Sequence, residues 1–353
     1  MKILISFLIA MSVYTVSMQS LSSQNSGLPK VNNKLAQGNS EFAINLYQEL
    51  GKKEDGNIFF SPYNVSTALT LVYAGARGQT AEQMRHVLHF PFEGTQLHSA
   101  FGELIKTANA KDSSYLLSVA NALWGQQGFK FLPEYLTLLN DRYSAGFEQL
   151  DFSTHSEEAR QTINSWIEKK TNDKIKELFK PGTIDGSARL VLTNAVYFKG
   201  SWVSEFDPKQ TKQEPFKLST PSRRQEITAS MMHQTENFKY GEQSDLQVIE
   251  LPYADENNAS HLSMIIMLPR MIDGLASLEK TLNAEKINQI LSTMRSRKVD
   301  LTIPKFQATS QFDLGDVLNN LGMSLVFSDK ADLSAMTGDH ELRLSLVVHK
   351  AFV

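Results

Sequence analysis

The sequence predicts an α+β fold in a single domain. Helix-forming patterns lie mainly in the first half of the chain, and strand-forming runs dominate the second half without regular βαβ alternation. No stretch from residue 39 to residue 353 is long or biased enough to be a linker, and there is no internal repeat. The chain has 353 residues, of which 41% are hydrophobic and 21% are charged, which is enough apolar material for a sizeable core.

The first 22 residues are predicted to be a secretory signal peptide. Lys2 precedes an apolar run from Ile3 to Val16, and a polar stretch rich in Ser and Gln follows. The run is shorter than the about 20 residues that a membrane span needs, and its layout is typical of a secretion signal. Cleavage after Ser17 and cleavage after Ser22 both fit small-residue preferences, and an uncleaved membrane anchor is the alternative. We therefore expect a secreted, extracellular protein with no membrane contact after signal removal.

Residues 23–38 are polar, and Pro29 and Gly38 favour a loop-like tether in this segment. Residues 39–353 are then expected to form the folded domain. Helix starts in this domain are predicted from caps, in particular from Ser61 with Pro62 at the first helical position. The first expected helix starts at Asn39 or Ser40 and ends at Gly51, and the second runs from Ser61 to Gly75. A third follows a capping box of Thr80 and Gln83. A fourth follows a capping box of Thr154 and Glu157 and extends as far as Pro181.

Strands are predicted from apolar runs rich in β-branched and aromatic residues. The run Leu190–Phe198 is nearly continuous in apolar residues, as expected for a strand that is covered on both faces. The predicted strands are Tyr115–Trp124, Leu190–Phe198, His261–Leu268, Val299–Phe306 and Leu342–Val353.

Composition and motifs exclude several classes of function. The net charge is −3 and basic residues are scattered, so nothing predicts nucleic-acid binding. The chain has no cysteine, which excludes disulfides, thiol catalysis and zinc–thiolate sites. Phosphate-binding and nucleotide-binding glycine loops, metalloprotease motifs and the G-x-S-x-G elbow are all missing. His86 and His89 could share a metal, but they have no third ligand nearby, so we predict no metal site. Because the catalytic and cofactor-binding motifs are missing, we also predict no cofactor and no enzyme activity.

Two polar residues interrupt otherwise apolar strands. Asn194 lies within Leu190–Phe198, and His349 lies within Leu344–Val353. A polar side chain in a buried sheet needs a hydrogen-bond partner, since leaving it unpaired costs about 1–3 kcal/mol. Each residue could be satisfied separately in the core. Alternatively, the two side chains bond to each other at a place where the sheet has to move.

Several motifs occur over residues 39–353 in the same order as in one known protein family. The stretch Asn57–Gly78, NIFFSPYNVSTALTLVYAGARG, resembles the family signature at its second helix. The stretch Leu192–Pro208, LTNAVYFKGSWVSEFDP, resembles the central-sheet strand and the turn after it. Further matches are VIELPYADE, SMIIMLP, DLTIPKFQATSQFDLGDVLNNLGM, FSDKADLSAM and LVVHKAFV. Together these motifs resemble the serpin family.

The resemblance implies roles for the unusual polar residues. It implies a polar cluster under the middle of the main sheet, called the shutter, and a point of first opening, called the breach. Asn64 stands where the family more often has Ser. The helix over the sheet face would be Ser156–Lys180. The implied shutter residues are Ser61, Asn64, Asn194 and His349, and the implied breach residues are Trp202 and Lys305.

The resemblance also implies a mechanism. A serpin holds a metastable five-stranded sheet and an exposed reactive loop that a target protease cleaves, after which the loop inserts as a new strand. The partner would be a serine protease, with a cysteine protease as the alternative, and the protein is expected to be a monomer. The chain is expected to stop before the reactive loop, so that no bait residue is present and the domain is incomplete at its C-terminus.

Two other interpretations remain open. One is a serpin-fold carrier or chaperone that does not inhibit, and the other is a naturally truncated, inactive serpin. The segment that resembles the family's heparin-binding helix, Gln96–Lys111, carries only Lys106 and Lys111 as basic residues. We therefore predict no heparin site.

Overall fold

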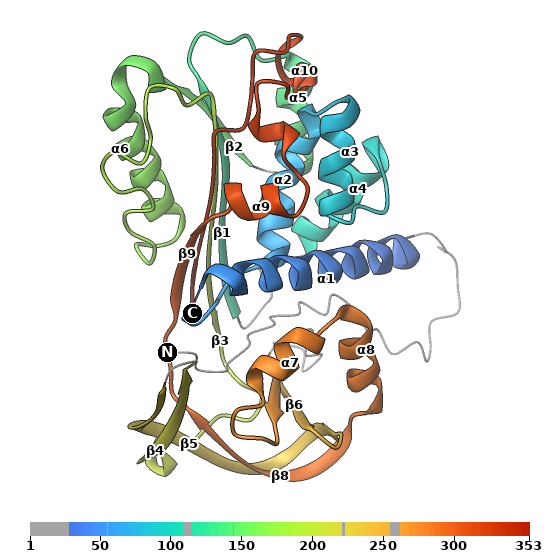
Figure 1. Cartoon of the computed structure of the whole chain (residues 1–353), viewed down its shortest axis with the longest axis vertical. Coiled ribbons are helices and arrows are strands. Elements are labelled where there is room, and N and C mark those ends of the chain that lie inside the picture. The colour runs from blue at the N-terminus through green and yellow to red at the C-terminus, as the bar shows by residue number, and fades with distance from the viewer. Residues whose placement is uncertain (1–27, 55, 109–114, 144, 221–222, 255–261) are drawn as a thin grey trace.

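The computed structural model describes residues 28–54, 56–108, 115–143, 145–220, 223–254 and 262–353, and its strands form two sheets (Figure 1). The central sheet has the strand order β2-β1-β3-β10-β9. The second sheet has the order β4-β5-β6-β7, and β8 also pairs with β5. The strands are β1 (Tyr115–Gln126), β2 (Gly146–Leu150), β3 (Leu190–Gly200), β4 (Lys212–Thr220), β5 (Arg223–Glu242), β6 (Leu246–Pro252), β7 (Ser263–Pro269), β8 (Arg295–Pro304), β9 (Thr309–Asp313) and β10 (Leu346–Phe352).

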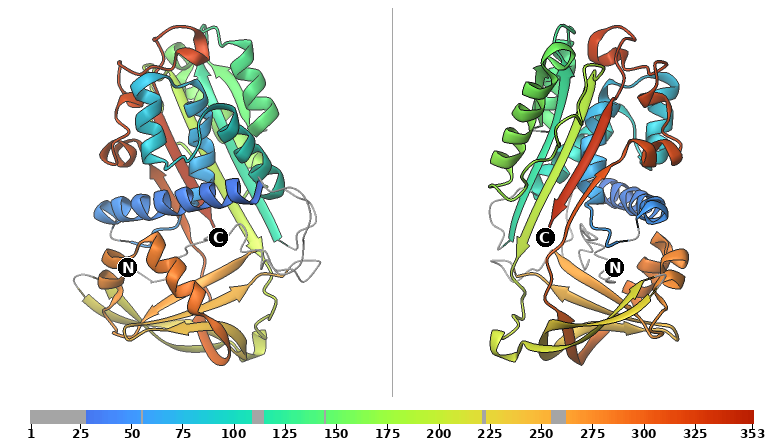
Figure 2. Two further views of the ribbon diagram at one scale, coloured as in Figure 1. Left: turned by 90° about the vertical axis from the view of Figure 1, so that its right-hand side faces the viewer. Right: turned by 60° about the vertical axis from the view of Figure 1, so that its left-hand side comes forward.

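Helices cover both faces of the central sheet. One helix, α6 (Phe152–Lys170), lies on one face, and a group around α2 (Pro62–Gly75) lies on the other (Figures 1 and 2). The second sheet forms a separate layer below, and residues 275–293, which form α7 and α8, pack against it (Figure 1). The remaining helices are α1 (Leu28–Lys53), α3 (Gly78–Val87), α4 (Gly94–Ala108), α5 (Pro133–Leu138), α7 (Leu275–Thr281), α8 (Ala284–Thr293), α9 (Gly315–Asn320) and α10 (Ser334–Thr337).

Strand β3 is buried on both faces, as its continuous apolar run predicts. Leu190 and Leu192 pack into the core on the α2 side, whereas Val191 and Ala195 pack into the core beneath α6. This alternation follows from the period of two residues in a strand. The strand therefore joins the two main cores, and its polar residues Thr193 and Asn194 are buried between them.

The start and end of α2 agree with the sequence prediction. The Ser61 hydroxyl caps the helix by accepting from the Asn64 amide, and Pro62 occupies the first turn. The helix ends at Gly75, where a Cβ atom would come within 2.1 Å of the Met336 side chain. A glycine is needed there because the chain that leads to the last strand packs directly against this end of α2.

The predicted tether and the predicted start of the first helix are wrong. Helix α1 begins at Leu28, so residues 28–38 are helical and belong to the folded domain. Leu35 is buried in the main core, and the Ser40 hydroxyl donates back to the Ala36 carbonyl, as in a helix interior and not at a cap. Gly38 is required within the helix because a Cβ atom would lie 2.1 Å from the carbonyl oxygen of His89.

Both predicted capping boxes are also wrong. The Thr80 hydroxyl accepts from the Asp332 amide, and the Gln83 side chain accepts from the Leu325 amide, so both side chains bind a distant segment. The cap of α6 is Asp151, whose carboxylate accepts from the Thr154 amide. Long-range partners and an upstream carboxylate thus replace the expected local bonds.

The expected helix Ser156–Lys180 is shorter at its C-terminal end. Helix α6 ends at Lys170, and residues 171–180, which we call the strap, continue without helical structure. In the strap Asn172, Asp173 and Glu177 have positive φ angles of 50°, 60° and 49°. These left-handed residues stop the helix about ten residues before Pro181.

All five predicted strands are present with shifted ends, and the described residues form five more strands that were not predicted. The predicted signal peptide and Lys111 lie outside the described residues. Within the described part of the chain, every helix is too short or too polar to span a bilayer.

Candidate functional site

The candidate site lies where two strands of the central sheet run parallel. Strand β10 pairs with β3 from Leu346↔Val191 to Phe352↔Tyr197, and we call this pairing the seam. In this register His349 lies directly opposite Asn194. Both residues are buried, and the start of α2 with Ser61 lies against them on the same side.

The hydrogen bonds of His349 fix its protonation state. The backbone N–H of Ser61 donates to Nε2 of His349 over 3.1 Å, so this nitrogen carries a lone pair. The other ring nitrogen, Nδ1, therefore carries the proton and donates to Oδ1 of Asn194. Burial lowers the pKa of His349 to about 3. The ring is neutral at neutral pH, and protonation would remove the acceptor for Ser61.

Asn194 is fully engaged in this network. Its amide oxygen accepts from His349, while its Nδ2 donates to the Asn64 carbonyl over 3.0 Å and to Oδ1 of Asn121. Asn121 lies on β1 in direct register with Asn194. The network thus crosses three adjacent strands and reaches α2, which places a polar row through an otherwise apolar layer.

Asn64 has an incomplete set of partners. Its Nδ2 donates to the Ser61 hydroxyl over 3.0 Å, but its buried Oδ1 accepts no hydrogen bond among the described residues. The structure therefore brings the four expected shutter residues together. It also adds Asn121, which sequence reasoning missed. The available signal was an asparagine inside the apolar strand Tyr115–Trp124, the same pattern that singled out Asn194.

The strap crosses the outer face of the seam and is bonded to several strands. Nζ of Lys350, on β10, donates to the carbonyls of Lys176 and Glu177 over 2.9 and 3.3 Å. Nε2 of Gln311, on β9, donates to the Leu178 carbonyl over 2.8 Å. Because β10 forms one side of the seam, these bonds connect the strap to a strand that separation of the seam would displace.

The two expected breach residues lie in the same region without a direct bond. Trp202 forms an isolated bridge with Tyr253, and the two rings stack with centroids 4.4 Å apart. Lys305 is exposed, and its backbone N–H donates to the Ser230 carbonyl. Phe306, its neighbour, packs against the same apolar cluster as Trp202.

Of the two histidines that were considered as metal ligands, His89 is bonded to other side chains and His86 is exposed. His89 pairs with Glu41 over 3.0 Å through Nδ1 and contacts Asn45 over 2.9 Å through Nε2. In the described residues no three acidic or histidine side chains are grouped closely enough to hold a metal ion.

Comparison with known proteins identifies the class. The family model described as "Serpin (serine protease inhibitor)" matches residues 37–353. The chain is 40% identical to human Serpin B4 over 340 residues, and this match covers 91% of this chain and 85% of Serpin B4. It is also 40% identical over 323 residues to the leukocyte elastase inhibitor of Xenopus tropicalis, with coverages of 89% and 84%. The chain therefore belongs to the serpin family of protease inhibitors.

Solved structures agree with this assignment. Uncleaved ovalbumin superposes with a TM-score of 0.85 at 29% identity, and the match covers 90% of this chain and 88% of the ovalbumin chain. A cleaved ovalbumin mutant described as loop-inserted superposes with a TM-score of 0.83 at 29% identity, with coverages of 90% and 86%. The expected serpin fold, with helices packed on mixed sheets, is confirmed.

Proposed function

We propose that this serpin inhibits serine proteases by inserting a cleaved reactive loop into the seam. The observation that carries the proposal is the parallel pairing of β3 with β10, with no strand between them. A parallel pair in the middle of a sheet is a place where another strand can be added if the two strands separate.

Strand direction favours such an addition. A segment that follows β10 and turns back would run antiparallel to β10 and, because β3 is parallel to β10, also antiparallel to β3. Insertion would replace one parallel pairing with two antiparallel pairings, which are slightly more stable per residue. The sheet would gain a strand and a full set of ladder hydrogen bonds. A gain of this kind can drive the insertion energetically.

The polar network suits a seam that opens. The hydrogen bond between His349 and Asn194 joins the two strands that have to separate. With apolar side chains at these positions, only the backbone ladder could bond an incoming strand. The asparagine and histidine side chains can exchange their bond across the seam for bonds to the new strand, so that polar groups stay satisfied.

The strap and α6 would have to shift during insertion. Lys350 bonds the strap to one side of the seam, and Asn172 contacts Ser118 of β1 over 3.4 Å on the other side. The strap therefore spans the line of opening. The loop-inserted state named for the cleaved ovalbumin mutant supports an insertion step in proteins of this fold.

The name of one relative indicates the first protease class to test. A relative at 40% identity is a leukocyte elastase inhibitor, so elastase-type serine proteases are the first candidates. Trypsin-type and chymotrypsin-type enzymes and a papain-type cysteine protease complete the panel. Secretion remains part of the proposal, and sequencing the N-terminus of protein recovered from the medium of its source cells tests it.

The test is covalent trapping by protein purified from its source cells. Incubation with each protease should give a band that survives boiling in SDS and has the summed mass of the two proteins. Cleaved, uncomplexed product should also melt at a higher temperature than the intact protein. Cleavage without a trapped complex and without a rise in melting temperature would instead indicate a carrier-type serpin.

A further inference from the structure

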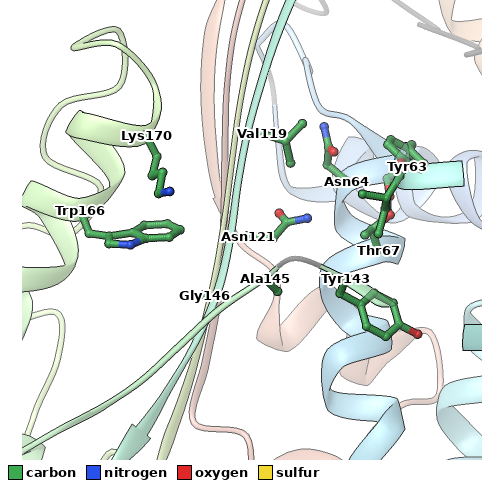
Figure 3. A pocket seen from close by; sticks show the side chains of 11 residues that line it. Tyr63, Asn64, Thr67, Val119, Asn121, Tyr143, Ala145, Gly146, Trp166 and Lys170 are labelled. Atoms are coloured by element: carbon green, nitrogen blue, oxygen red, sulfur yellow. Dashed lines mark hydrogen bonds between the residues drawn. The ribbon is translucent and has the colours of Figure 1, made fainter. Parts of the chain in front are cut away.

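A cavity of about 240 Å³ lies at the edge of the central sheet, away from the seam (Figure 3). Strand β2 pairs with β1 only from Ala122 onward, where Ala122 faces Gly146. The preceding part of β1, including Val119 and Asn121, has no β2 partner and forms one wall of the cavity. The space is therefore built by a strand that stops short of its neighbour.

The cavity reaches both faces of the sheet. Trp166 and Lys170 of α6 lie on one side of β1, and Asn64 and Thr67 of α2 lie on the other (Figure 3). Trp166 can lie close to the strand because residue 146 is glycine, where a Cβ atom would be 2.9 Å from the indole ring. A bound molecule would thus contact two helices that do not otherwise meet at this edge.

The outer wall of the cavity favours an aromatic anion. Lys170 is the single charged residue among the described residues that line it, so none of these residues is acidic. The Nζ atom of Lys170 lies 5.6 Å from the centre of the Trp166 ring. A carboxylate can pair with the ammonium group while an aromatic ring packs against the indole.

The inner wall offers an acceptor without a donor. Asn64 is 1% exposed, and its Oδ1 accepts no hydrogen bond among the described residues. The neighbouring Thr67 hydroxyl already donates to the Tyr63 carbonyl over 2.7 Å, so it does not supply the missing proton. A ligand that carries a hydroxyl group at the end opposite its carboxylate would satisfy this oxygen.

We propose that this cavity binds a small hydroxyaryl carboxylate. The carboxylate pairs with Lys170, the ring packs against Trp166, and the hydroxyl donates to Oδ1 of Asn64. The cavity of about 240 Å³ has room for roughly eight water-sized groups of about 30 Å³ each, which suits a ligand with a single ring. Because Asn64 and Asn121 also bond to Asn194, an occupied cavity connects α6 to the polar network and favours the closed sheet.

The test is calorimetric titration of the free protein with 3-(4-hydroxyphenyl)propanoate. We expect saturable binding with one site, and at least tenfold weaker binding in Lys170→Met. Lys169→Met is the matched control, because Lys169 is exposed on the same helix but does not line the cavity, and its affinity should be unchanged. The ligand analogues 3-phenylpropanoate and 4-ethylphenol lack one polar group each, and both should bind more weakly.

A second variant guards against an indirect effect. Val119→Trp fills the cavity from β1 and should abolish binding while the circular dichroism spectrum stays native. No detectable binding to the unmodified protein, or equal binding in Lys170→Met, Val119→Trp and Lys169→Met, would overturn the proposal. The titration involves no protease, so its outcome is independent of the proposed inhibition.

Discussion

Nδ1 of His349 donates a hydrogen bond to Oδ1 of Asn194, across the seam between β10 and β3. A third residue fixes the direction of this bond, because the Ser61 backbone amide donates to the opposite ring nitrogen, Nε2 of His349. It is fixed on the asparagine side as well, because Nδ2 of Asn194 donates to Asn64 and Asn121. The side chains that join the two strands are therefore held in one tautomer and one amide orientation.

Replacing His349 with alanine should destabilise the protein. The change leaves Oδ1 of Asn194 and the Ser61 amide without a partner in a buried site, which costs about 1–3 kcal/mol of unfolding free energy. Urea denaturation measures this loss. His86→Ala is the control, because His86 is exposed, and its midpoint should be unchanged. Equal midpoints for the two variants would show that the seam bond contributes nothing.

Stability should fall as the pH is lowered from about 7 to about 5. Burial holds the pKa of His349 at about 3 and that of His98 at about 4, whereas an unfolded histidine titrates near 6.5. The unfolded chain therefore binds more protons below that value, and His349 alone removes about 2 kcal/mol at about pH 5. Unfolding free energies at both pH values should show a smaller drop in His349→Gln than in the unmodified protein, and an equal drop would contradict the assignment.

Thr193 links the seam strand to a buried tryptophan. Nε1 of Trp124 donates to the Thr193 hydroxyl over 2.9 Å, and both side chains are buried. Thr193→Val keeps the shape but leaves the indole N–H unpaired, so it should cost about 1–3 kcal/mol. Thr193→Ser keeps the hydroxyl and should cost less. Thermal denaturation of the two variants gives the comparison, and a valine variant as stable as the serine variant would refute the role of this bond.

Removing Lys350 should loosen the strap. Lys350→Met loses both bonds to the Lys176 and Glu177 carbonyls, and about 1 kcal/mol of lost bonding corresponds to roughly fivefold more frequent opening. Hydrogen–deuterium exchange should be faster in residues 174–180 and unchanged in α2. The exposed residue Lys180 provides the control variant Lys180→Met. Unchanged exchange in the strap of Lys350→Met would show that other contacts hold it.

The sequence predicted the elements whose signal is local. The cap at Ser61 and the doubly buried strand β3 depend on residue types at short spacing, and both are present. Strand β5 was missed because its polar residues, such as Glu236 and Lys239, hide the strand pattern of a surface sheet. Its long pairing with β8 forms only in the folded protein.

The capping boxes failed for a related reason. Thr80 and Gln83 have the right spacing for a local cap, but the segment around Asp332 and Leu325 supplies backbone donors from far along the chain. For the site, Asn194 and His349 stood out because each is polar within an apolar run. The part played by Asn121 depends on strand register, and the cavity depends on where β2 begins, so neither follows from local sequence.

The most direct test of the account is the melting temperature of the protein before and after cleavage by an elastase-type protease, with the products run on a denaturing gel. Opening of the seam predicts a complex that resists boiling in SDS, together with cleaved product that melts at a higher temperature than the intact protein. Cleavage that yields neither a complex nor added thermal stability would mean that the seam between β3 and β10 does not accept a strand.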